Sequence, residues 1–192
     1  MANEDQNPKK EKISLEKKIL QHPTAINIFV DGYDDIFSDF DARQYEVRAL
    51  SDDFLLEAKK ASHEKQPTDL ELVFFVPSKE RNANHEKIIR SRLSKHFKKH
   101  FQQLKETRKN VTKKGYALLA VGVIIMFITS YILFYNHEKD FFLNFFVVLL
   151  EPAGWFLFWE GSNMIFFGSK KETPDLEFYG KMSGCKISFE SY

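Results

Sequence analysis

The sequence predicts an α+β membrane protein: a transmembrane helical hairpin, a small cytoplasmic domain of strands and helices, and a long stalk helix continuous with the first membrane helix. Three observations lead to this prediction. Two apolar runs, 115–135 and 141–159, stand on either side of a short polar break. A basic segment with helical periodicity comes directly before the first run. An apolar run at 70–76, rich in β-forming residues, lies further upstream.

The two apolar runs predict the hairpin. The first, GYALLAVGVIIMFITSYILFY, has no charged residue in 21 positions. A helix of about 20 apolar residues crosses a hydrocarbon core of about 30 Å. Because lipid cannot form hydrogen bonds with the backbone, such a segment has to be helical. The second run carries one carboxylate, Glu151. The break between them has room only for a turn. We therefore expect a membrane helix at 115–135, a turn at 136–140, and a second helix with an interfacial extension at 141–167.

The charge distribution predicts the orientation of the hairpin. Net charge is only +1, but 31–57 holds nine acids against two arginines, and 87–114 holds eleven basic residues against one acid. Basic residues also follow the second run, at Lys170 and Lys171, whereas the turn has one lysine and two acids. Positive charge stays on the cytoplasmic side, so both termini are expected in the cytoplasm. The N-terminus lacks the apolar core of a cleavable signal peptide.

The cytoplasmic α+β domain is expected at 24–83, after a mobile arm at 1–23. Strands are predicted at 25–30, 44–50 and 70–76, because these segments are rich in apolar and β-branched residues. The 70–76 strand is almost wholly apolar, which is typical of a central strand. Ser51 has the character of an N-cap for a helix that reaches about Ala61. The arm could instead form a short amphipathic helix through Ile13, Leu15, Ile19 and Leu20.

The stalk helix is predicted at 84–114. Apolar residues recur every three to five positions and form one stripe: Ile88, Ile89, Leu93, Phe97, Phe101 and Leu104. No glycine or proline interrupts the segment before Gly115, so the stalk should continue into the first membrane helix. A cytoplasmic tail is expected at 168–192, with Pro174 and Gly180 in a connecting loop. A last strand at 186–190 would return to the sheet of the N-terminal domain.

Glu151 is the residue with the strongest functional signal. A charged group at mid-membrane is expensive and turns toward protein or water. Pro152 follows it and should bend the helix, while Gly154 allows close helix packing. Asn144, Glu151 and Trp155 share one side of a helix, and two helices alone cannot bury that side. An oligomer is therefore expected, in which repeated Glu151 carboxylates would line a cation pore.

Alternatives to this pore remain open. Phe145 and Leu149 are candidates for an apolar constriction that closes the pore. Glu151 could also be a structural tie, protonated or bonded to Thr129, to Ser130, or to a carbonyl freed by Pro152. Glu160 is expected to be a solvated end residue.

The basic stalk has two functional interpretations. It could bind an anionic ligand, such as a nucleotide or nucleic acid, through phosphates, or it could contact anionic lipid headgroups. The candidate residues are Arg90, Arg92, Lys95, Lys98, Lys99, Lys113 and Lys114. The plainer interpretations are a solvated positive flank for 105–114 and, further up the stalk, pairing with the acidic stretch 31–57.

Sites for metal or catalysis receive little support. The acidic segment DGYDDIFSDFDA could hold calcium, but it lacks the spacing of an EF-hand loop, and an acidic turn is the simpler interpretation. His96 and His100 stand four positions apart without a third zinc ligand at suitable spacing. No phosphate-binding loop or nucleophile motif is present. We therefore expect neither a cofactor nor an enzyme.

The order LELVFFVP, a helix containing RSRLSKHFKKHF, a membrane helix and LLEPAGWFLFWEG resembles a group of uncharacterised small bacterial and archaeal membrane proteins, over roughly residues 70 to 190. The resemblance implies a two-helix protein of the prokaryotic inner membrane, and Glu151, Gly154 and Trp155 are the matching positions. This chain departs from the group at Phe158-Trp159-Glu160. The layout is also similar to small membrane effectors of bacterial antiphage defence, such as the channel subunit of the Hailong system.

These observations favour an oligomeric inner-membrane channel, cation-conducting and gated through its cytoplasmic domain. The alternative is a non-conducting anchor that recruits a cytoplasmic partner protein. Expected partners are membrane lipid, further copies of the chain, and a ligand or protein bound to the cytoplasmic domain.

Overall fold

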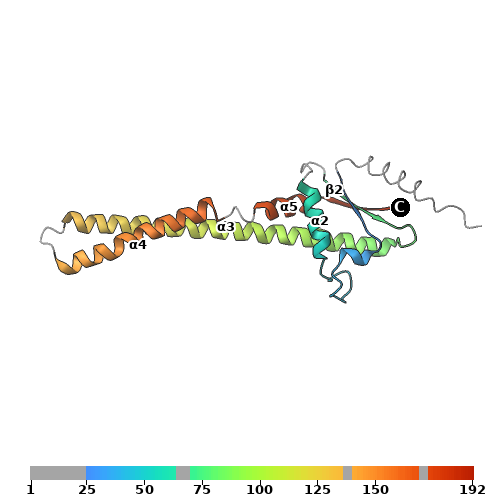
Figure 1. Ribbon diagram of the computed structural model, residues 1–192, viewed down its shortest axis with the longest axis horizontal. Coiled ribbons are helices and arrows are strands. Elements are labelled where there is room, and N and C mark those ends of the chain that lie inside the picture. Colours follow the sequence, from blue (N-terminus) through green and yellow to red (C-terminus); the bar gives the residue numbers. More distant parts are fainter. Residues whose placement is uncertain (1–24, 64–69, 136–139, 169–172) are drawn as a thin grey trace, which may run out of the picture. The chain divides into compact units, whose positions relative to one another are not determined.

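The computed structural model describes residues 25–63, 70–135, 140–168 and 173–192. The elements, shown in Figure 1, are β1 (Ile26–Phe29), the 3-10 helix η1 (Tyr33–Ile36), α2 (Asp52–His63), β2 (Glu71–Val76), α3 (Ala83–Tyr135), α4 (Phe141–Phe166), α5 (Thr173–Ser183) and β3 (Lys186–Ser191). They form two units. The first unit contains the residues up to Phe101 together with Glu177–Tyr192, and the second unit is Gln102–Leu176. The predicted arm at 1–23, most of the predicted turn and Lys170 and Lys171 lie outside the described residues.

The first unit is built on a three-stranded parallel sheet in the order β1-β2-β3. Leu72 of β2 pairs with Ile26 on one side and with Ile187 on the other. The prediction that the last strand returns to the sheet is therefore confirmed, and β2 is the central strand. Parallel neighbours require a crossover connection. The first crossover contains η1 and α2, and the second contains α3, α4 and α5.

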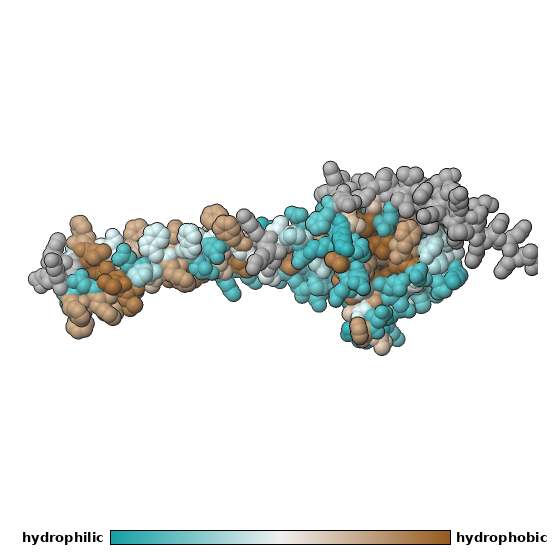
Figure 2. All heavy atoms as spheres, viewed as in Figure 1, coloured by the Kyte–Doolittle hydropathy of each residue, from teal (hydrophilic) through white to brown (hydrophobic). Residues whose placement is uncertain are grey.

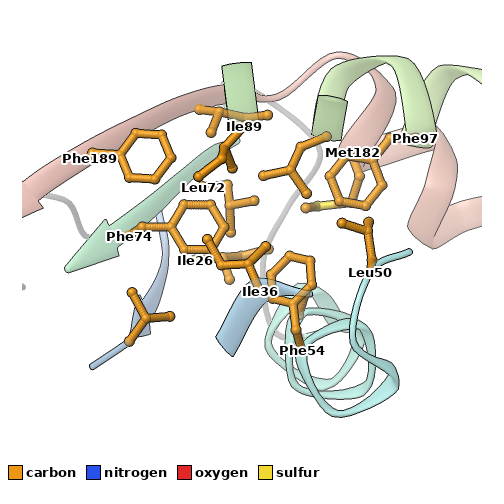
Figure 3. Packing of buried hydrophobic residues seen from close by; sticks show 14 of the residues in the cluster. Ile26, Ile36, Leu50, Phe54, Leu72, Phe74, Ile89, Phe97, Met182 and Phe189 are labelled. Atoms are coloured by element: carbon orange, nitrogen blue, oxygen red, sulfur yellow. The ribbon is translucent and has the colours of Figure 1, made fainter. Parts of the chain in front are cut away.

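The core lies between one face of this sheet and the helices. Alternate residues of β2, Leu72, Phe74 and Val76, are fully buried in it. Figure 3 shows Phe54 of α2, Ile89 and Phe97 of α3 and Met182 of α5 directed toward these strand residues. Ile89, Leu93 and Phe97 have no exposed surface. The N-terminal part of the predicted apolar stripe of the stalk therefore packs on the sheet.

A buried polar network fixes the start of α3. The Glu86 carboxylate, 7% exposed, pairs with the Arg81 guanidinium and accepts a hydrogen bond from the Tyr33 hydroxyl at 3.1 Å. The same Tyr33 oxygen accepts from the backbone N–H of Asn82 at 2.9 Å. Burial raises the pKa of the Tyr33 hydroxyl, which keeps it neutral. The network joins η1 to the loop that leads into α3.

Two predicted elements are wrong. Residues 44–50 form turns and a single bridge, between Phe37 and Leu50, because side chains satisfy this backbone in place of a neighbouring strand. The Asp41 carboxylate accepts from Ala49 N–H, and the Arg92 guanidinium donates to the Arg48 carbonyl. The predicted loop around Pro174 and Gly180 is the helix α5. A proline is tolerated in the first turn of a helix, where its missing N–H has no intrahelical partner.

Replacing Glu86 with alanine should open the first unit. Removing one partner leaves the Arg81 charge and the Tyr33 hydroxyl uncompensated, and breaking a largely buried ion pair costs about 3–5 kcal/mol. We expect faster amide hydrogen exchange throughout β2 and β3 of the full-length protein, measured by mass spectrometry. Glu80→Ala, at an exposed carboxylate six positions earlier, should leave the exchange unchanged. Equal protection in both variants would contradict the role assigned to Glu86.

Candidate functional site in the apolar hairpin

The second unit is a helical hairpin of α3, from Gln102 onward, and α4. Both helices are long and apolar enough to cross a membrane. Their large apolar side chains are mostly exposed, as the brown and pale surface over α3 and α4 in Figure 2 shows. Asp140 caps α4 by accepting a hydrogen bond from Phe142 N–H at 2.8 Å. A helix pair that exposes this much apolar surface to water would aggregate, so an apolar solvent or a protein partner has to cover it.

Glycines form the contact between the two helices. A Cβ at Gly122 would lie 2.6 Å from the Phe158 nitrogen, and one at Gly161 would lie 2.6 Å from the Leu119 nitrogen. Gly115 and Gly122 are seven positions apart, as are Gly154 and Gly161, so each pair lies along one line of its helix. Thr129 and Val147 continue these lines and are also buried. The backbones therefore approach closely, as small residues allow. We call these six residues the seam.

Glu151 lies beside the seam and is exposed. Relative to Gly154, at 100° per residue, Glu151 lies about 60° round α4, Asn144 about 80° and Trp155 about 100°. All three are exposed, as expected for residues on one side that the hairpin does not bury. Within the described part of the chain, Glu151 has no hydrogen-bond or ion-pair partner. We call this side, with Asn144, Glu151 and Trp155, the polar side.

Two further polar groups lie near the polar side. Ser130 is exposed and lies about 80° round α3 from Gly122, and in an antiparallel pair the same rotation leads to the same side of both helices. Pro152 lies inside α4, which continues through it. Because proline has no N–H, the carbonyl of Val148 has no donor four residues on. A hydroxyl, an amide, a carboxylate and a carbonyl that lacks its usual helical donor therefore lie in neighbouring turns, a set that binds cations or hydrogen-bonds a protein neighbour.

The predicted constriction residues lie on other sides of α4 than Glu151. Phe145 lies about 180° round α4 from Gly154 and Leu149 about 140° in the direction opposite to Glu151. Both are exposed. Their role in closing a pore stays a prediction.

The structural tie to Thr129 is also absent. Thr129 is 4% exposed, and its hydroxyl donates to the carbonyls of its own helix, at Ile125 (3.1 Å) and Met126 (2.9 Å). It belongs to the seam and turns away from Glu151. Gly154 lies in the seam as well, against the side chains of Met126 and Ile125.

The basic stalk residues separate into different environments. Arg90 donates to the Ile187 carbonyl at 2.9 Å and lies over the Phe189 ring, and Arg92 donates to the Arg48 carbonyl. Both stabilise the first unit. Lys95, Lys98, Lys99, Lys113 and Lys114 are exposed. Among the described residues, none of these seven side chains forms an ion pair, so the predicted pairing with the acidic stretch 31–57 does not occur within them. Asp34 and Asp41 of that stretch pair instead with Arg48 and Arg43.

The centroids of the His96 and His100 rings lie 4.2 Å apart with the ring planes tilted by 37°, and His100 stacks on Tyr179 of α5 at 5.2 Å. Among the described residues no group of three histidine, cysteine or carboxylate side chains is placed to hold a metal. Burial, followed by the nearby positive charges of His100, Arg92 and Lys99, lowers the pKa of His96 to about 4. These histidines pack α5 on α3.

Sequence reasoning missed the seam. The seven-residue spacing of Gly115 with Gly122 and of Gly154 with Gly161 is visible in the sequence and marks one line on each helix. This spacing indicates a helix contact only once the structure shows that the glycine line of α3 faces the glycine line of α4. Comparison with protein-family models, with curated proteins and with solved structures finds no match to this chain.

Gly122→Ala should loosen the hairpin. The new Cβ meets backbone atoms at 2.6 and 2.9 Å, and backbone cannot move aside as a side chain can. We expect a loss of about 1–3 kcal/mol, as for other overpacked contacts. Gly154→Ala, whose Cβ meets side chains at 3.1 and 3.2 Å and backbone only at 3.4 Å, should lose less. The measurement is unfolding in increasing SDS, followed by the fluorescence of Trp155 and Trp159. An unchanged midpoint for Gly122→Ala would refute the seam.

His96→Gln should reduce the acid sensitivity of the first unit. The pKa of His96 is about 4 in the folded chain and about 6.5 when unfolded. The unfolded chain therefore binds an extra proton between these values, and stability falls as pH drops from about 6.5 to about 4. Thermal midpoints from circular dichroism at several pH values should fall less steeply in His96→Gln. The exposed His63, changed to glutamine, is the control, and its profile should match wild type. A wild-type slope in His96→Gln would contradict this account.

Proposed function

We propose that this protein is a homo-oligomeric, cation-conducting channel of the bacterial inner membrane, gated through its cytoplasmic unit. The observation that carries the proposal is Glu151, which lies exposed in the middle of an apolar helix and has no side-chain partner among the residues that the structure describes. The two apolar helices support membrane insertion by their length and composition.

The energy of Glu151 in a bilayer supports the oligomer. A charged residue at the centre of a membrane helix costs about 2.5–3.5 kcal/mol even on insertion scales, and such residues face protein or water. The seam uses a different side of α4, so the hairpin itself does not shield this carboxylate. A second copy of the chain, placed against the polar side, can shield it together with Asn144 and Ser130.

Closed rotational symmetry supports conduction. Symmetric copies around an axis near the polar side would bring one Glu151 from each chain into a ring. Rings of carboxylates attract and select cations in membrane pores. Trp155, next to Glu151 on the same side, supplies a large ring that would narrow such a path.

The topology supports gating. The hairpin is inserted into the crossover between β2 and β3, and α3 is a single helix that contributes to both units. A change in the packing of Ile89, Leu93 and Phe97 on the sheet would therefore act on the same helix that carries half of the seam. By its layout the channel would suit an effector of antiphage defence, which depolarises the membrane when its sensor is engaged.

The second candidate is a non-conducting anchor, with termini in the cytoplasm, that holds a partner protein. The fully exposed ring of Phe40 favours it, since the loop that carries Phe40 is fixed by the Asp41–Arg43 pair and presents a large apolar side chain to solvent. The anchor requires no water at Glu151.

Current across planar bilayers tests the proposal. Wild-type protein in a KCl gradient should give a reversal potential close to the potassium value, and Glu151→Gln should move it toward zero because the ring loses its charge. Glu160→Gln is the matched control, since Glu160 is the other carboxylate of α4. We expect it to keep wild-type selectivity.

The opposing results are equally defined. Selectivity unchanged in Glu151→Gln would remove Glu151 from the pore. Absence of current from wild-type protein that is oligomeric in the same detergent would favour the anchor.

A further inference from the structure

Two adjoining grooves lie in the first unit, between the loop 42–48 and the N-terminal turns of α3. Their volumes are about 500 and about 470 Å³, and they share Glu46 and Ile88 in their walls. Both volumes lie within the range of small-molecule sites. The first groove also has Tyr45 and His85 in its wall, with their rings edge to face at 5.3 Å between centroids. The second groove is lined mainly by α3.

The second groove is rich in hydrogen-bond donors. Lys87, Ser91 and Lys95 follow one another at four-residue intervals, so they stand in a row on one side of α3, about 6 Å apart. Arg92 and Asn84 lie in the same wall. Against these donors the groove has one carboxylate, Glu46. The floor between them is the apolar side chain of Ile88.

The cations of this row are available to a ligand. Within the described part of the chain, Lys87 and Lys95 have no ion-pair partner. The guanidinium of Arg92 is held in place by two hydrogen bonds, at 3.1 and 3.2 Å, to the carbonyl of Arg48. Its second terminal nitrogen forms no hydrogen bond with the described part of the chain. Because the Arg92 side chain is already held in one orientation, it loses little conformational entropy when a ligand binds.

The loop on the other side is equally fixed. Arg48 pairs with Asp34 and donates to the Ser38 carbonyl, and Tyr45 stacks on Phe37 at 5.1 Å. The groove is therefore preformed, with both walls held by bonds that do not use Lys87, Ser91 or Lys95.

We propose that this pair of grooves binds a phosphate-bearing small molecule, with its phosphates along Lys87, Ser91 and Lys95 and an apolar or planar portion on Ile88 and Tyr45. A row of ammonium groups with a hydroxyl between them matches consecutive phosphate oxygens, which accept strong charge-assisted hydrogen bonds. A ligand that bridges loop 42–48 and α3 stiffens the helix that continues into the hairpin. The role of this ligand as a gating signal rests on the proposed channel function. The binding site itself does not depend on that function.

Binding of tripolyphosphate and of ATP to the full-length protein in detergent, measured by isothermal titration calorimetry, tests the site. Wild type should bind at least one probe saturably, at one site per chain. The double variant Lys87→Gln/Lys95→Gln should weaken the affinity at least tenfold. Lys98→Gln/Lys99→Gln removes the same charge from exposed positions of α3 outside the grooves and should bind as wild type does.

Three results would overturn the site: no saturable binding of either probe, equal weakening in both double variants, or wild-type affinity in Lys87→Gln/Lys95→Gln. Circular dichroism verifies that the variants remain folded. Glu151→Gln separates this proposal from the channel, because it should bind the probes with wild-type affinity whether or not the protein conducts. Probe binding without any change in current would leave the site standing and reject its gating role.

Discussion

The parallel pairing of β3 with β2 is the constraint on which the rest of the structure depends. Glu71 pairs with Lys186 and Val76 with Ser191, so the chain that leaves β2 has to return and run beside it in the same direction. Parallel strands can be joined only by a crossover, and this crossover contains the whole hairpin. The helix that leaves the sheet, α3, and the helix that returns, α5, both pack on it, through Phe97 and Phe178. The chain segments that come before and after the hairpin therefore belong to one small core.

Within the hairpin, one side of α4, the seam, packs against α3, and another, the polar side, remains exposed. Gly122 and Gly161 bring the two backbones close enough that no side chain fits between them there, and in lipid such close packing is a main source of helix association. The seam leaves Asn144, Glu151 and Trp155 uncovered. A hairpin that hid Glu151 against α3 would need small or polar residues there, and α3 presents glycines whose space the backbone of α4 already fills.

The sequence predicts those features that rest on long periodic patterns. The apolar runs, the stripe Ile89–Leu93–Phe97 and the continuous strand 70–76 each repeat one signal many times. Sequence patterns fail where tertiary bonds decide: 44–50 alternates as a strand does, but Asp41 and Arg92 bind its backbone, and among the described residues it forms only a single bridge, between Phe37 and Leu50. The helix α5 escapes sequence prediction because proline usually indicates a loop, although in a first helical turn it breaks no bond. In the sequence, Lys87, Ser91 and Lys95 belong to a generally basic helix and do not indicate a groove. The groove exists only because loop 42–48, which is distant in sequence, forms its opposite wall.

The choice between channel and anchor depends on what Glu151 and Pro152 do to the energy of the hairpin. An anchor needs only apolar surface and a stable helix pair, and a leucine at position 151 would serve it better. The present α4 carries a carboxylate that opposes insertion and a proline that removes a hydrogen bond, each worth about 3 kcal/mol in such a setting. They are consecutive residues, and Pro152 gives the Val148 carbonyl no N–H four residues on. An arrangement this unfavourable for anchoring alone is the one expected where charge has to meet water inside a membrane, which is why we propose the polar side as the functional side of the hairpin.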